Sequence, residues 1–291
     1  MKNKSSKYNK KIEKELRNKI ILVTGGAGSI GTILVNRLLE YPVNSVRVLD
    51  INEHALFTMK QKIKNTKLRL LLGSILDKER VEMAGKDVDI IFHLAAVKNI
   101  EISEFNPIET IDTNINGTVN MIKMAMKNQP KKFLNISTDK AVESSTLYGA
   151  TKLLGERLAT WAGLHSSPTK FGTVRFGNIF EAKGNVFEVW EEQVNNKKSI
   201  SITHPNMERY FFHAEEAVSF ILNCLSLVNY GETFVPKMKS HKIQELADKY
   251  STKQKIIGLR KGEKLNEVLL SDDEKKRAKE DSKMWIIKPL N

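Results

Sequence analysis

The sequence contains a single cysteine, Cys224, so no disulfide can form within the chain. This excludes a small secreted protein held together by disulfides and favours a reducing compartment, for which we expect the cytoplasm. Long hydrophobic runs are also missing. No apolar stretch approaches the ~20 residues of a membrane-spanning helix, and the N-terminus lacks the apolar core of a signal peptide. We therefore expect no membrane span.

Two further classes of protein are disfavoured by what the sequence lacks. Basic residues do not alternate with aromatic ones, so nucleic-acid binding is not expected. The six histidines show no ligand spacing with cysteine or acidic residues, so no metal site is expected. With 291 residues, 41% of them hydrophobic, the chain fits one large domain or two lobes that share a core.

Positive charge is concentrated at the start of the chain. The net charge is +13, and residues 1–19 carry eight basic residues against two acidic ones. A basic tail can bind nucleic acid or an anionic membrane surface. Because apolar residues are sparse there, we instead expect residues 1–18 to be a solvated tail that precedes the fold.

From residue 19 to residue 176, short apolar runs alternate with amphipathic segments. Strands are expected at 20–24, 45–50, 68–73, 89–95, 132–137 and 170–176, and helices at 30–40, 54–64, 108–126 and 147–164. This alternation predicts an α/β fold, a Rossmann-like doubly wound parallel sheet with helices on both faces. Residues 177–291 are irregular and predict a smaller substrate-binding lobe interleaved with this NAD(P)-binding domain. The charged segment 271–283 is expected to be an exposed helix.

A glycine-rich loop follows the first expected strand and opens the first helix. Gly25, Gly28 and Gly31 have the spacing of a dinucleotide-binding loop, in which the backbone approaches a pyrophosphate at a helix N-terminus. Asp50 ends the second strand 19 residues past Gly31, where a carboxylate can accept hydrogen bonds from the adenosine ribose. Because that carboxylate repels a 2′-phosphate, NAD is favoured over NADP as the cofactor.

Two groups of polar residues predict the chemistry. Tyr148 and Lys152 lie four residues apart on an expected helix, where the Lys152 ammonium is expected to lower the pKa of the Tyr148 hydroxyl. The second group, Thr138, Asp139 and Lys140, follows the strand 132–137 at the carboxyl edge of the sheet. A neighbouring acid and base are what a β-elimination requires: one removes the proton α to a carbonyl, and the other protonates the departing oxygen.

Together these motifs resemble the short-chain dehydrogenase/reductase superfamily, and within it the UDP-N-acetylglucosamine 4,6-dehydratases of the polysaccharide-biosynthesis subgroup. The resemblance covers about residues 18–289. It rests on the segments 23–31, 93–98, 113–118, 137–142, 148–153, 174–178, 203–205, 209–211 and 258–264. Larger relatives carry membrane helices before the catalytic domain, so this chain is expected to be the soluble form. Ser74 and the segment 180–184 depart from the usual family pattern.

The resemblance implies a role for each matching residue. The residues that it places around a tightly bound, regenerated NAD are Gly25, Gly28, Ser29, Ile30, Gly31, Asp50, Ser74, Ile75, Ala95, Ala96, Asn114, Tyr148 and Lys152. Those implied to bind the UDP-N-acetylglucosamine substrate are Lys98, Thr138, Asn178, Arg209, Arg260 and Glu263. Tyr148, aided by Thr138, starts oxidation at C4, Lys140 removes the C5 proton, and Asp139 protonates the C6 oxygen. The resemblance also implies a homo-oligomer.

Two alternative functions share part of this pattern. A nucleotide-sugar 4-epimerase needs the glycine loop and the Tyr148/Lys152 pair, but it does not need Asp139 and Lys140. A non-catalytic dinucleotide sensor on the same fold needs neither pair. The sequence leaves the stereochemistry at C5 open, because retaining and inverting relatives both carry the Asp-Lys pair.

Overall fold

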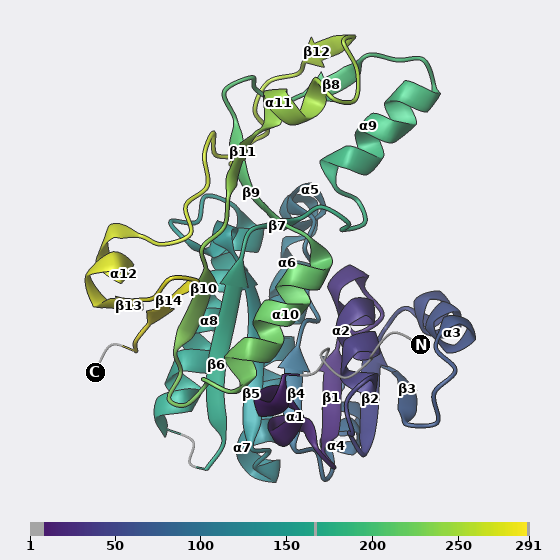
Figure 1. Ribbon diagram of the computed structural model, residues 1–291, viewed down its shortest axis with the longest axis vertical. Coiled ribbons are helices and arrows are strands. Elements are labelled where there is room, and N and C mark those ends of the chain that lie inside the picture. Colours follow the sequence, from purple (N-terminus) through teal and green to yellow (C-terminus); the bar gives the residue numbers. More distant parts are fainter. Residues whose placement is uncertain (1–8, 166–167, 290–291) are drawn as a thin grey trace.

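The computed structural model describes residues 9–165 and 168–289, which are built around a nine-stranded sheet (Figure 1). Its strand order is β13-β14-β10-β6-β5-β4-β1-β2-β3, and all neighbours are parallel except the two pairs that involve β14. The strands are β1 (Ile20–Thr24), β2 (Ser45–Asp50), β3 (Leu68–Leu72), β4 (Ile90–His93), β5 (Lys132–Thr138), β6 (Lys170–Phe176), β10 (Thr233–Pro236), β13 (Ala278–Glu280) and β14 (Met284–Ile287).

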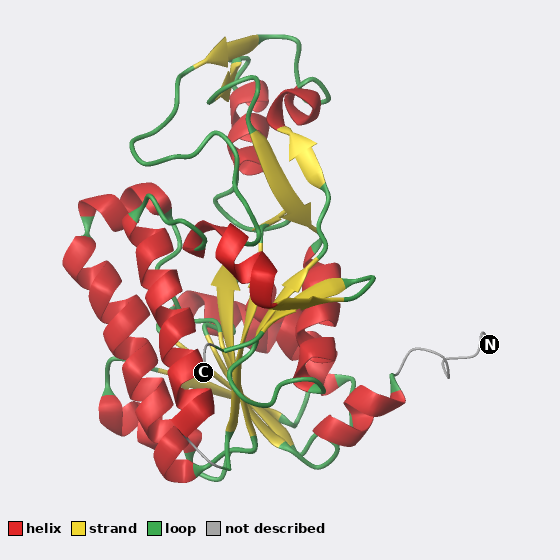
Figure 2. Cartoon of the chain, turned by 90° about the vertical axis from the view of Figure 1, so that its left-hand side faces the viewer, coloured by secondary structure: helices red, strands yellow, loops and turns green. Residues whose placement is uncertain are grey.

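Helices cover both faces of this sheet, which Figure 2 shows edge-on between two helical layers. One core cluster joins the sheet to α1 (Lys10–Leu16), α2 (Ser29–Leu39), α3 (Glu53–Lys62) and α10 (Ala214–Leu225). The other joins it to α4 (Lys78–Gly85), α7 (Gly117–Asn128) and α8 (Leu147–His165). The predicted doubly wound fold is confirmed. No helix in the part of the chain that the structure describes is both long and apolar enough to cross a membrane.

Strand order determines where a ligand can bind. The chain runs outward from β1 to β3 on one side, then returns to place β4, β5 and β6 on the other side of β1. In such sheets the crevice lies outside the carboxyl ends of the strands, where the order reverses. Here that point lies between β1 and β4, and β5 brings the Thr138 segment to the same edge.

A smaller lobe stands over this carboxyl edge, at the top of Figure 1. Its elements are β7 (Asn178–Ile179), α9 (Val186–Asn195), β8 (Ile200–Ile202), β9 (Glu208–Phe212), β11 (Ser240–Lys242), α11 (Ile243–Ala247) and β12 (Gln254–Ile256). A separate cluster that includes Phe187 and Trp190 forms its core. Between and after these elements, α10, β10 and β14 return to the large sheet. The division of the chain into two domains stays a prediction.

The structure differs from the expected elements in several places. The expected helix 108–126 is divided into α6 (Pro107–Ile111), a π-helical turn (Asp112–Asn116) and α7. A π turn inserts extra backbone into a helix and often marks a functional position. Within 271–283, only α12 (Asp272–Arg277) is helical, because residues 278–280 form the edge strand β13, which pairs with β14. The helix α4 was not expected.

The N-terminal segment corrects the prediction of a solvated tail. Residues 10–16 form α1, which is capped by the Asn9 side chain. Ile12 and Leu16 are buried in the core cluster that includes α10, and Glu15 pairs with Lys132 at 2.7 Å. Two apolar residues four apart are enough to give a short helix one packing face. Residues 1–8, which hold the rest of the expected tail, lie outside the described residues.

We predict that Leu16→Ala destabilises the fold by about 2–5 kcal/mol, because it leaves a cavity between α1 and α10. The matched control is Lys14→Ala on the exposed side of the same helix, which should change stability by less than about 0.5 kcal/mol. Urea unfolding measures both. Equal, small effects would show that α1 does not contribute to the stability of the core.

His93, at the end of β4, is buried between Thr24 and Thr118. Its Nδ1 lies 2.7 Å from Thr24 Oγ1, and its Nε2 lies 3.0 Å from Thr118 Oγ1. It is therefore a packed residue at a strand end, with both ring nitrogens beside hydroxyl groups. Burial, assisted by the Lys152 ammonium, lowers the pKa of His93 from 6.5 to about 3.

This shift predicts acid sensitivity. Between pH 6.5 and 3 the unfolded chain binds a proton on His93 that the folded chain does not, so stability falls as the pH falls. Between pH 7.5 and 5 the loss assigned to His93 is about 2 kcal/mol. Urea unfolding at both pH values should show a correspondingly smaller loss for His93→Gln than for the exposed control His54→Gln. The same loss in both variants would contradict the assignment.

Candidate active site

The glycine loop forms a close-fitting cradle at the carboxyl end of β1. Gly25 has a φ of +64°, and a Cβ there would lie 2.7 Å from the Ala95 backbone nitrogen. A Cβ on Gly31 would lie 2.6 Å from the Gly25 carbonyl oxygen. The N-cap of α2 is Gly28, whose lack of a side chain leaves the first N–H groups of the helix without a side-chain cap. Such a helix N-terminus suits a pyrophosphate.

Asp50 faces this loop from the end of β2. Its Oδ2 accepts a hydrogen bond from the Ala27 N–H at 3.0 Å, and its Oδ1 accepts one from the Asn52 N–H at 3.0 Å. The carboxylate is therefore fixed beside the glycine cradle, as a dinucleotide ribose requires. Ser74 and Ile75 follow β3 at the same edge, but the Ile75 side chain is buried against Gly117 rather than exposed at the crevice.

Asn114 holds the loop after β4 in place. Located in the π turn, it accepts a hydrogen bond from the Val97 N–H at 2.7 Å and donates to the Val97 carbonyl at 2.9 Å. It also donates to Thr151 Oγ1 on α8 at 3.0 Å. These three hydrogen bonds require the Asn114 side-chain amide to face both the Val97 loop and α8. The π turn gives it that orientation. The predicted residues Ala95 and Ala96 belong to the loop that Asn114 anchors.

The predicted acid–base residues come together immediately after β5. Thr138 Oγ1 donates to Asp139 Oδ1 at 2.9 Å, and Lys140 Nζ donates to the same oxygen at 3.0 Å. Lys140 also donates to Asn178 Oδ1 at 3.0 Å. Asp139 is fully buried, and its Oδ2 has no hydrogen-bond partner. Thr138 is also a hydrogen-bond partner of Tyr148, so the second predicted group reaches the first.

The pKa values of Tyr148 and Lys152 correct one expectation. Burial and the Asp139 carboxylate raise the pKa of Tyr148, and the hydrogen bond with Thr138 only partly opposes them. The pKa of Tyr148 is therefore raised rather than lowered as expected, and Lys152 is not among the groups that shift it in this structure. Burial lowers the pKa of Lys152 itself to about 8, against the effect of Glu156. Spacing on a helix does not reveal that both groups are desolvated.

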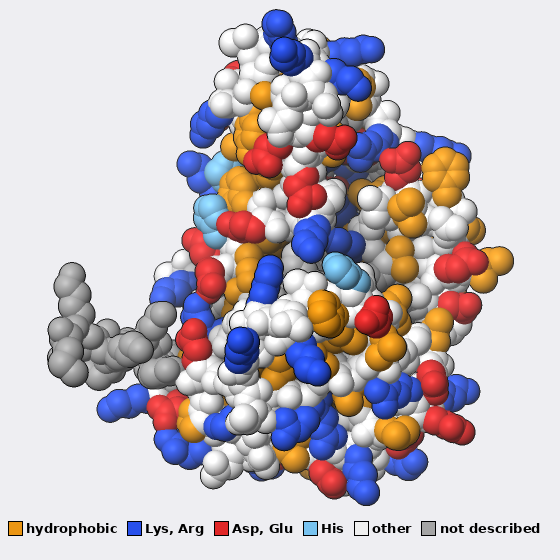
Figure 3. All heavy atoms as spheres, turned by 90° about the vertical axis from the view of Figure 1, so that its right-hand side faces the viewer, with side chains coloured by type: hydrophobic (Ala, Val, Ile, Leu, Met, Phe, Trp, Pro, Cys, Tyr) orange, Lys and Arg blue, Asp and Glu red, His pale blue; other side chains and the backbone are white. Residues whose placement is uncertain are grey.

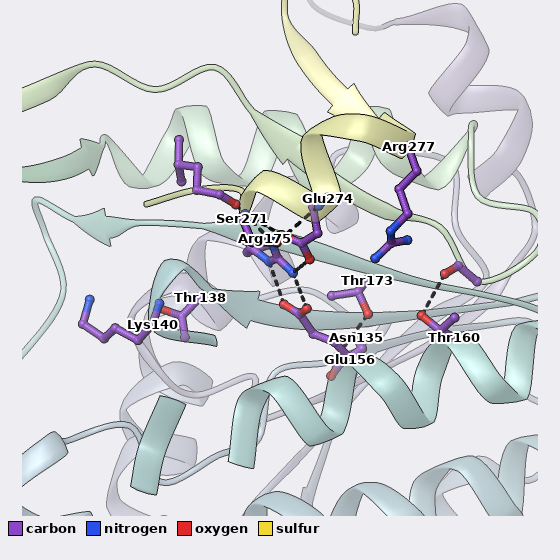
Figure 4. Close-up of polar contacts among 12 residues, drawn as sticks. Asn135, Thr138, Lys140, Glu156, Thr160, Thr173, Arg175, Ser271, Glu274 and Arg277 are labelled. Atoms are coloured by element: carbon purple, nitrogen blue, oxygen red, sulfur yellow. Dashed lines mark hydrogen bonds and ion pairs between the residues drawn. The ribbon is translucent and has the colours of Figure 1, made fainter. Parts of the chain in front are cut away.

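A buried ion network holds the catalytic helix to the C-terminal segment (Figure 4). The Arg175 guanidinium on β6 donates to both oxygens of Glu156 on α8, at 2.9 and 2.5 Å. It also donates to both oxygens of Glu274 on α12, at 2.8 and 2.7 Å, and to the Leu269 carbonyl at 3.0 Å. The sequence signal was a lone arginine inside the apolar strand 170–176, and we did not single it out.

Arg209 and Glu263, both predicted to bind substrate, are brought together beside the site. The buried Arg209 guanidinium donates to the carbonyls of Lys264 and Leu265, and lies 3.5 Å from Glu263 Oε1. Glu263 Oε2 accepts a hydrogen bond from the Arg260 N–H at 3.2 Å. These contacts give the segment 260–265 a defined shape, whereas the predicted Arg260 itself is an exposed residue of this loop.

Lys98 reaches the segment 180–184, which departed from the family pattern. Its Nζ donates to the Lys183 carbonyl at 3.0 Å, and the Lys183 N–H donates to Ser29 Oγ at 3.1 Å. The segment therefore connects the start of α2 to the loop after β4. Figure 3 shows Lys and Arg side chains in the recess between the lobe and the larger body, with Asp and Glu side chains on the lobe above it. The basic side chains suit an anionic ligand.

One buried acidic residue near the site was missed from the sequence. Glu267 is 8% exposed, and its Oε2 is buried with no hydrogen-bond partner. It interacts electrostatically with Asp139 and Lys140. The sequence feature that indicates its burial is a glutamate within the mostly apolar residues 265–270, where an exposed charge is unusual.

Comparisons with known proteins agree with this site. An uncharacterized membrane protein of Methanocaldococcus jannaschii is 41% identical over 288 residues, covering 94% of this chain and 86% of that protein. A Campylobacter jejuni protein named UDP-N-acetylglucosamine 4,6-dehydratase (inverting) is 37% identical over 277 residues, covering 93% and 83%. The crystal structure of Pen from Bacillus thuringiensis superposes with a TM-score of 0.90 at 33% identity, covering 94% and 89%. The model of the polysaccharide biosynthesis protein family matches residues 21–289, and the chain belongs to that family.

Proposed function

We propose that this protein is a UDP-N-acetylglucosamine 4,6-dehydratase that makes a UDP-4-keto-6-deoxy-N-acetylhexosamine for glycan biosynthesis. The observation that carries the proposal is the pair of the buried Asp139 and the partly buried Lys140, joined through Thr138 to Tyr148 beside a dinucleotide cradle. Oxidation alone needs only Tyr148 and Lys152. When water is also eliminated, a further base is needed at C5 and an acid at the C6 oxygen.

The residues at the carboxyl edge suit NAD. Gly25, Gly28 and Gly31 leave room for a pyrophosphate, and the carboxylate of Asp50 suits a ribose with a free 2′-hydroxyl. The same edge carries Ser29, Ile30, Ser74, Ile75, Ala95, Ala96 and Asn114. When bound, NAD supplies a hydride acceptor that takes the hydride from C4 and gives it back at C6. The cradle makes tight retention of the cofactor reasonable, since NAD must stay through both transfers.

Tyr148 removes the proton of the C4 hydroxyl. Its phenol is partly buried, and desolvation and the Asp139 carboxylate raise its pKa, so a nearby positive charge must favour the phenolate. We propose that Lys152, the cation one turn further along the same helix, supplies this charge when substrate and cofactor fill the site. Thr138, whose hydroxyl already contacts Tyr148, is placed to hold the reacting sugar hydroxyl.

Lys140 and Asp139 carry out the elimination. The 4-ketone acidifies the C5–H, and Lys140, in its neutral amine form, takes that proton. Asp139 then gives a proton to the C6 oxygen as water leaves. Lys140 Nζ donates a hydrogen bond to Asn178 Oδ1 at 3.0 Å, which limits the positions that the Lys140 side chain can adopt. The UDP group is bound by Arg260 and Lys98, and Arg209 orders the segment that presents Glu263 to the uridine ribose.

An exposed apolar surface supports a homo-oligomer. Phe105 at the end of α5 (Ile100–Phe105) is 77% exposed, and Ile108 on the adjoining α6 is 70% exposed. Leu154 and Trp161 on the neighbouring α8 add to it. Apolar patches of this kind mark protein interfaces. We propose that two copies meet there and that the enzyme is cytoplasmic, in keeping with its lone, buried thiol Cys224.

Mass spectrometry of a UDP-N-acetylglucosamine incubation tests the function. We expect loss of one water from the nucleotide sugar. A new isomer of unchanged mass would instead identify a 4-epimerase, and no reaction by folded protein that retains its cofactor would favour a dinucleotide sensor.

We predict that Lys140→Ala separates oxidation from elimination. The variant should reduce its bound cofactor on mixing with saturating substrate, because the cradle and Tyr148 are intact. Dehydration should fall by about 10²–10⁴-fold, since no group accepts the C5 proton. Absorbance of the reduced nicotinamide measures the first step, and product formation and deuterium uptake at C5 from D₂O measure the second. Dehydration at the wild-type rate would show that Lys140 is not the base.

The cofactor prediction concerns Asp50. Denaturing the purified protein should release mainly NAD, because the Asp50 carboxylate repels a 2′-phosphate. Asp50→Asn, which removes the charge and keeps the size, should raise the affinity for NADP relative to NAD. Chromatography of the released dinucleotide and binding titrations measure both effects. Recovery of mainly NADP from the wild type would contradict the assignment.

A further inference from the structure

A basic hollow lies beside the amino ends of β2 and β3, at the opposite end of the sheet from the candidate active site. In Figure 1 this is the lower part of the sheet, where β2, β3 and α4 meet. The hollow has a volume of about 400 Å³, and its lining consists of Asn44, Ser45, Arg47, Arg69, Leu71, Met83 and Lys86. Among the described residues, this lining contains three cations and no carboxylate. It is a concentration of positive charge to which the proposed function gives no role.

Two of these cations are neighbours in the sheet. Arg47 and Arg69 are register partners in the parallel pair of β2 and β3, so their backbones lie one strand spacing apart, about 4.8 Å. Leu49 and Leu71 follow them two positions later and pack in the core cluster that includes α4, so both guanidiniums emerge on the α4 face of the sheet. Like charges at directly opposed positions repel one another. Strand pairing alone therefore gives no reason for two arginines here.

Backbone carbonyls hold each of the two guanidiniums by a single nitrogen. Arg47 Nη1 donates to two carbonyls at the C-terminal end of α4, at 2.9 and 2.6 Å. Arg69 Nη1 donates to the carbonyls of Thr66 and Leu68, at 2.5 and 3.0 Å. All the hydrogen bonds that these guanidiniums make to described residues go to backbone carbonyls, so no carboxylate there balances either charge. The edge formed by Nε and Nη2 remains available for a ligand on both arginines.

The other residues of the hollow also favour an anion. Lys86 adds a third positive charge, and Asn44 and Ser45 add side chains that can donate hydrogen bonds. The negative end of the α4 dipole would repel an anion, but Arg47 covers it through its bonds to the last carbonyls. The open edge of a guanidinium presents two N–H groups in the geometry that phosphate oxygens accept. The hollow thus offers two such edges, held in place before any ligand binds.

We propose that this hollow binds a phosphate group, carried either by a soluble phosphate or diphosphate ion or by a phospholipid headgroup. A phosphate monoester carries roughly 1.5 to 2 negative charges at neutral pH, which balances Arg47 and Arg69 and removes their mutual repulsion. Its oxygens can accept hydrogen bonds from both open guanidinium edges at once. Because the hollow and the catalytic cluster lie at opposite ends of the strands, this binding does not depend on the proposed dehydratase function.

Arg69→Gln tests the site, because it removes one guanidinium from an exposed side chain of the edge strand β3 and leaves the backbone pairing in place. Titration calorimetry with inorganic pyrophosphate should show binding to the hollow of the wild type that is about ten- to hundredfold weaker in Arg69→Gln. Pyrophosphate that binds at the candidate active site does so equally in both proteins, so the difference reports the hollow. Equal affinities in the two proteins would overturn the proposal.

Arg157→Gln is the matched control. Arg157 is an exposed arginine on α8 that does not line the hollow, so this variant loses the same charge and should bind pyrophosphate as the wild type does. A loss of affinity as large as that of Arg69→Gln would show that only the net charge matters and would contradict a defined site. The rate of dehydration should be unchanged in Arg69→Gln, so this titration and the test of the proposed function fail independently.

Hydrogen exchange of the wild type locates the bound anion without any variant. Pyrophosphate should slow amide exchange in the three segments that surround the hollow, residues 44–49, 66–71 and 83–86, because the ligand joins them. Slower exchange confined to the glycine loop and the segment 260–264 would place the bound anion at the candidate active site and overturn the proposal.

Vesicles of phosphatidylcholine, with and without phosphatidic acid, distinguish the two sources of phosphate. Sedimentation with the phosphatidic acid vesicles that is lost in Arg69→Gln and kept in Arg157→Gln would identify a phospholipid headgroup. Sedimentation that is the same in all three proteins, together with pyrophosphate binding that depends on Arg69, would identify a soluble phosphate. Either result supports the proposal, and the lack of any binding that depends on Arg69 in both assays would refute it.

Discussion

The Arg175 guanidinium is 1% exposed, and its charge is balanced by two carboxylates from distant parts of the chain. Glu156 lies one turn beyond Lys152 on the catalytic helix, and Glu274 begins the return of the chain to the sheet edge. Removing one partner from such a buried group costs several kcal/mol, of order 3–5. Because the segment 260–267 lies between the lobe and Glu274, Arg175 also limits where that segment can sit over the site.

The Arg175 network holds a preorganised acid–base cluster at the carboxyl edge of the sheet. The rest of the fold is a common dinucleotide-binding fold. Tyr148, Thr138, Asp139 and Lys140 are linked by side-chain hydrogen bonds, with α8 held on one side and β9 on the other. Their environment is desolvated, so charge on any one of them changes the protonation of the others. The fold supplies the redox cofactor site, and the cluster determines which reaction follows the oxidation.

The features of the fold and the site that a local sequence pattern determines could be predicted from the sequence, and those that tertiary contacts determine could not. The strands, the glycine loop, Asp50 and the Thr138–Lys140 group follow from runs, spacings and strand ends, and the structure has them at one edge. Ile12 and Leu16 do not predict a packed helix, because two apolar residues in a basic segment give a weak pattern, yet α10 offers them a surface. The Arg175 network and the burial of Glu267 depend on segments far apart in the sequence, such as Glu274, 99 residues beyond Arg175, which no local window contains. The raised pKa of Tyr148 depends on how the turn after β5 packs against α8, which spacing alone does not show.

The central claim is that the site oxidises C4 and then moves the hydride to C6 as water leaves. UDP-N-acetylglucosamine carrying deuterium at C4 tests this most directly, with NMR of the product locating the label. The account predicts that the deuterium appears in the C6 methyl group of a 4-keto-6-deoxy sugar, without loss to solvent. Deuterium that stays at C4 of a product of unchanged mass would contradict it and identify an epimerase.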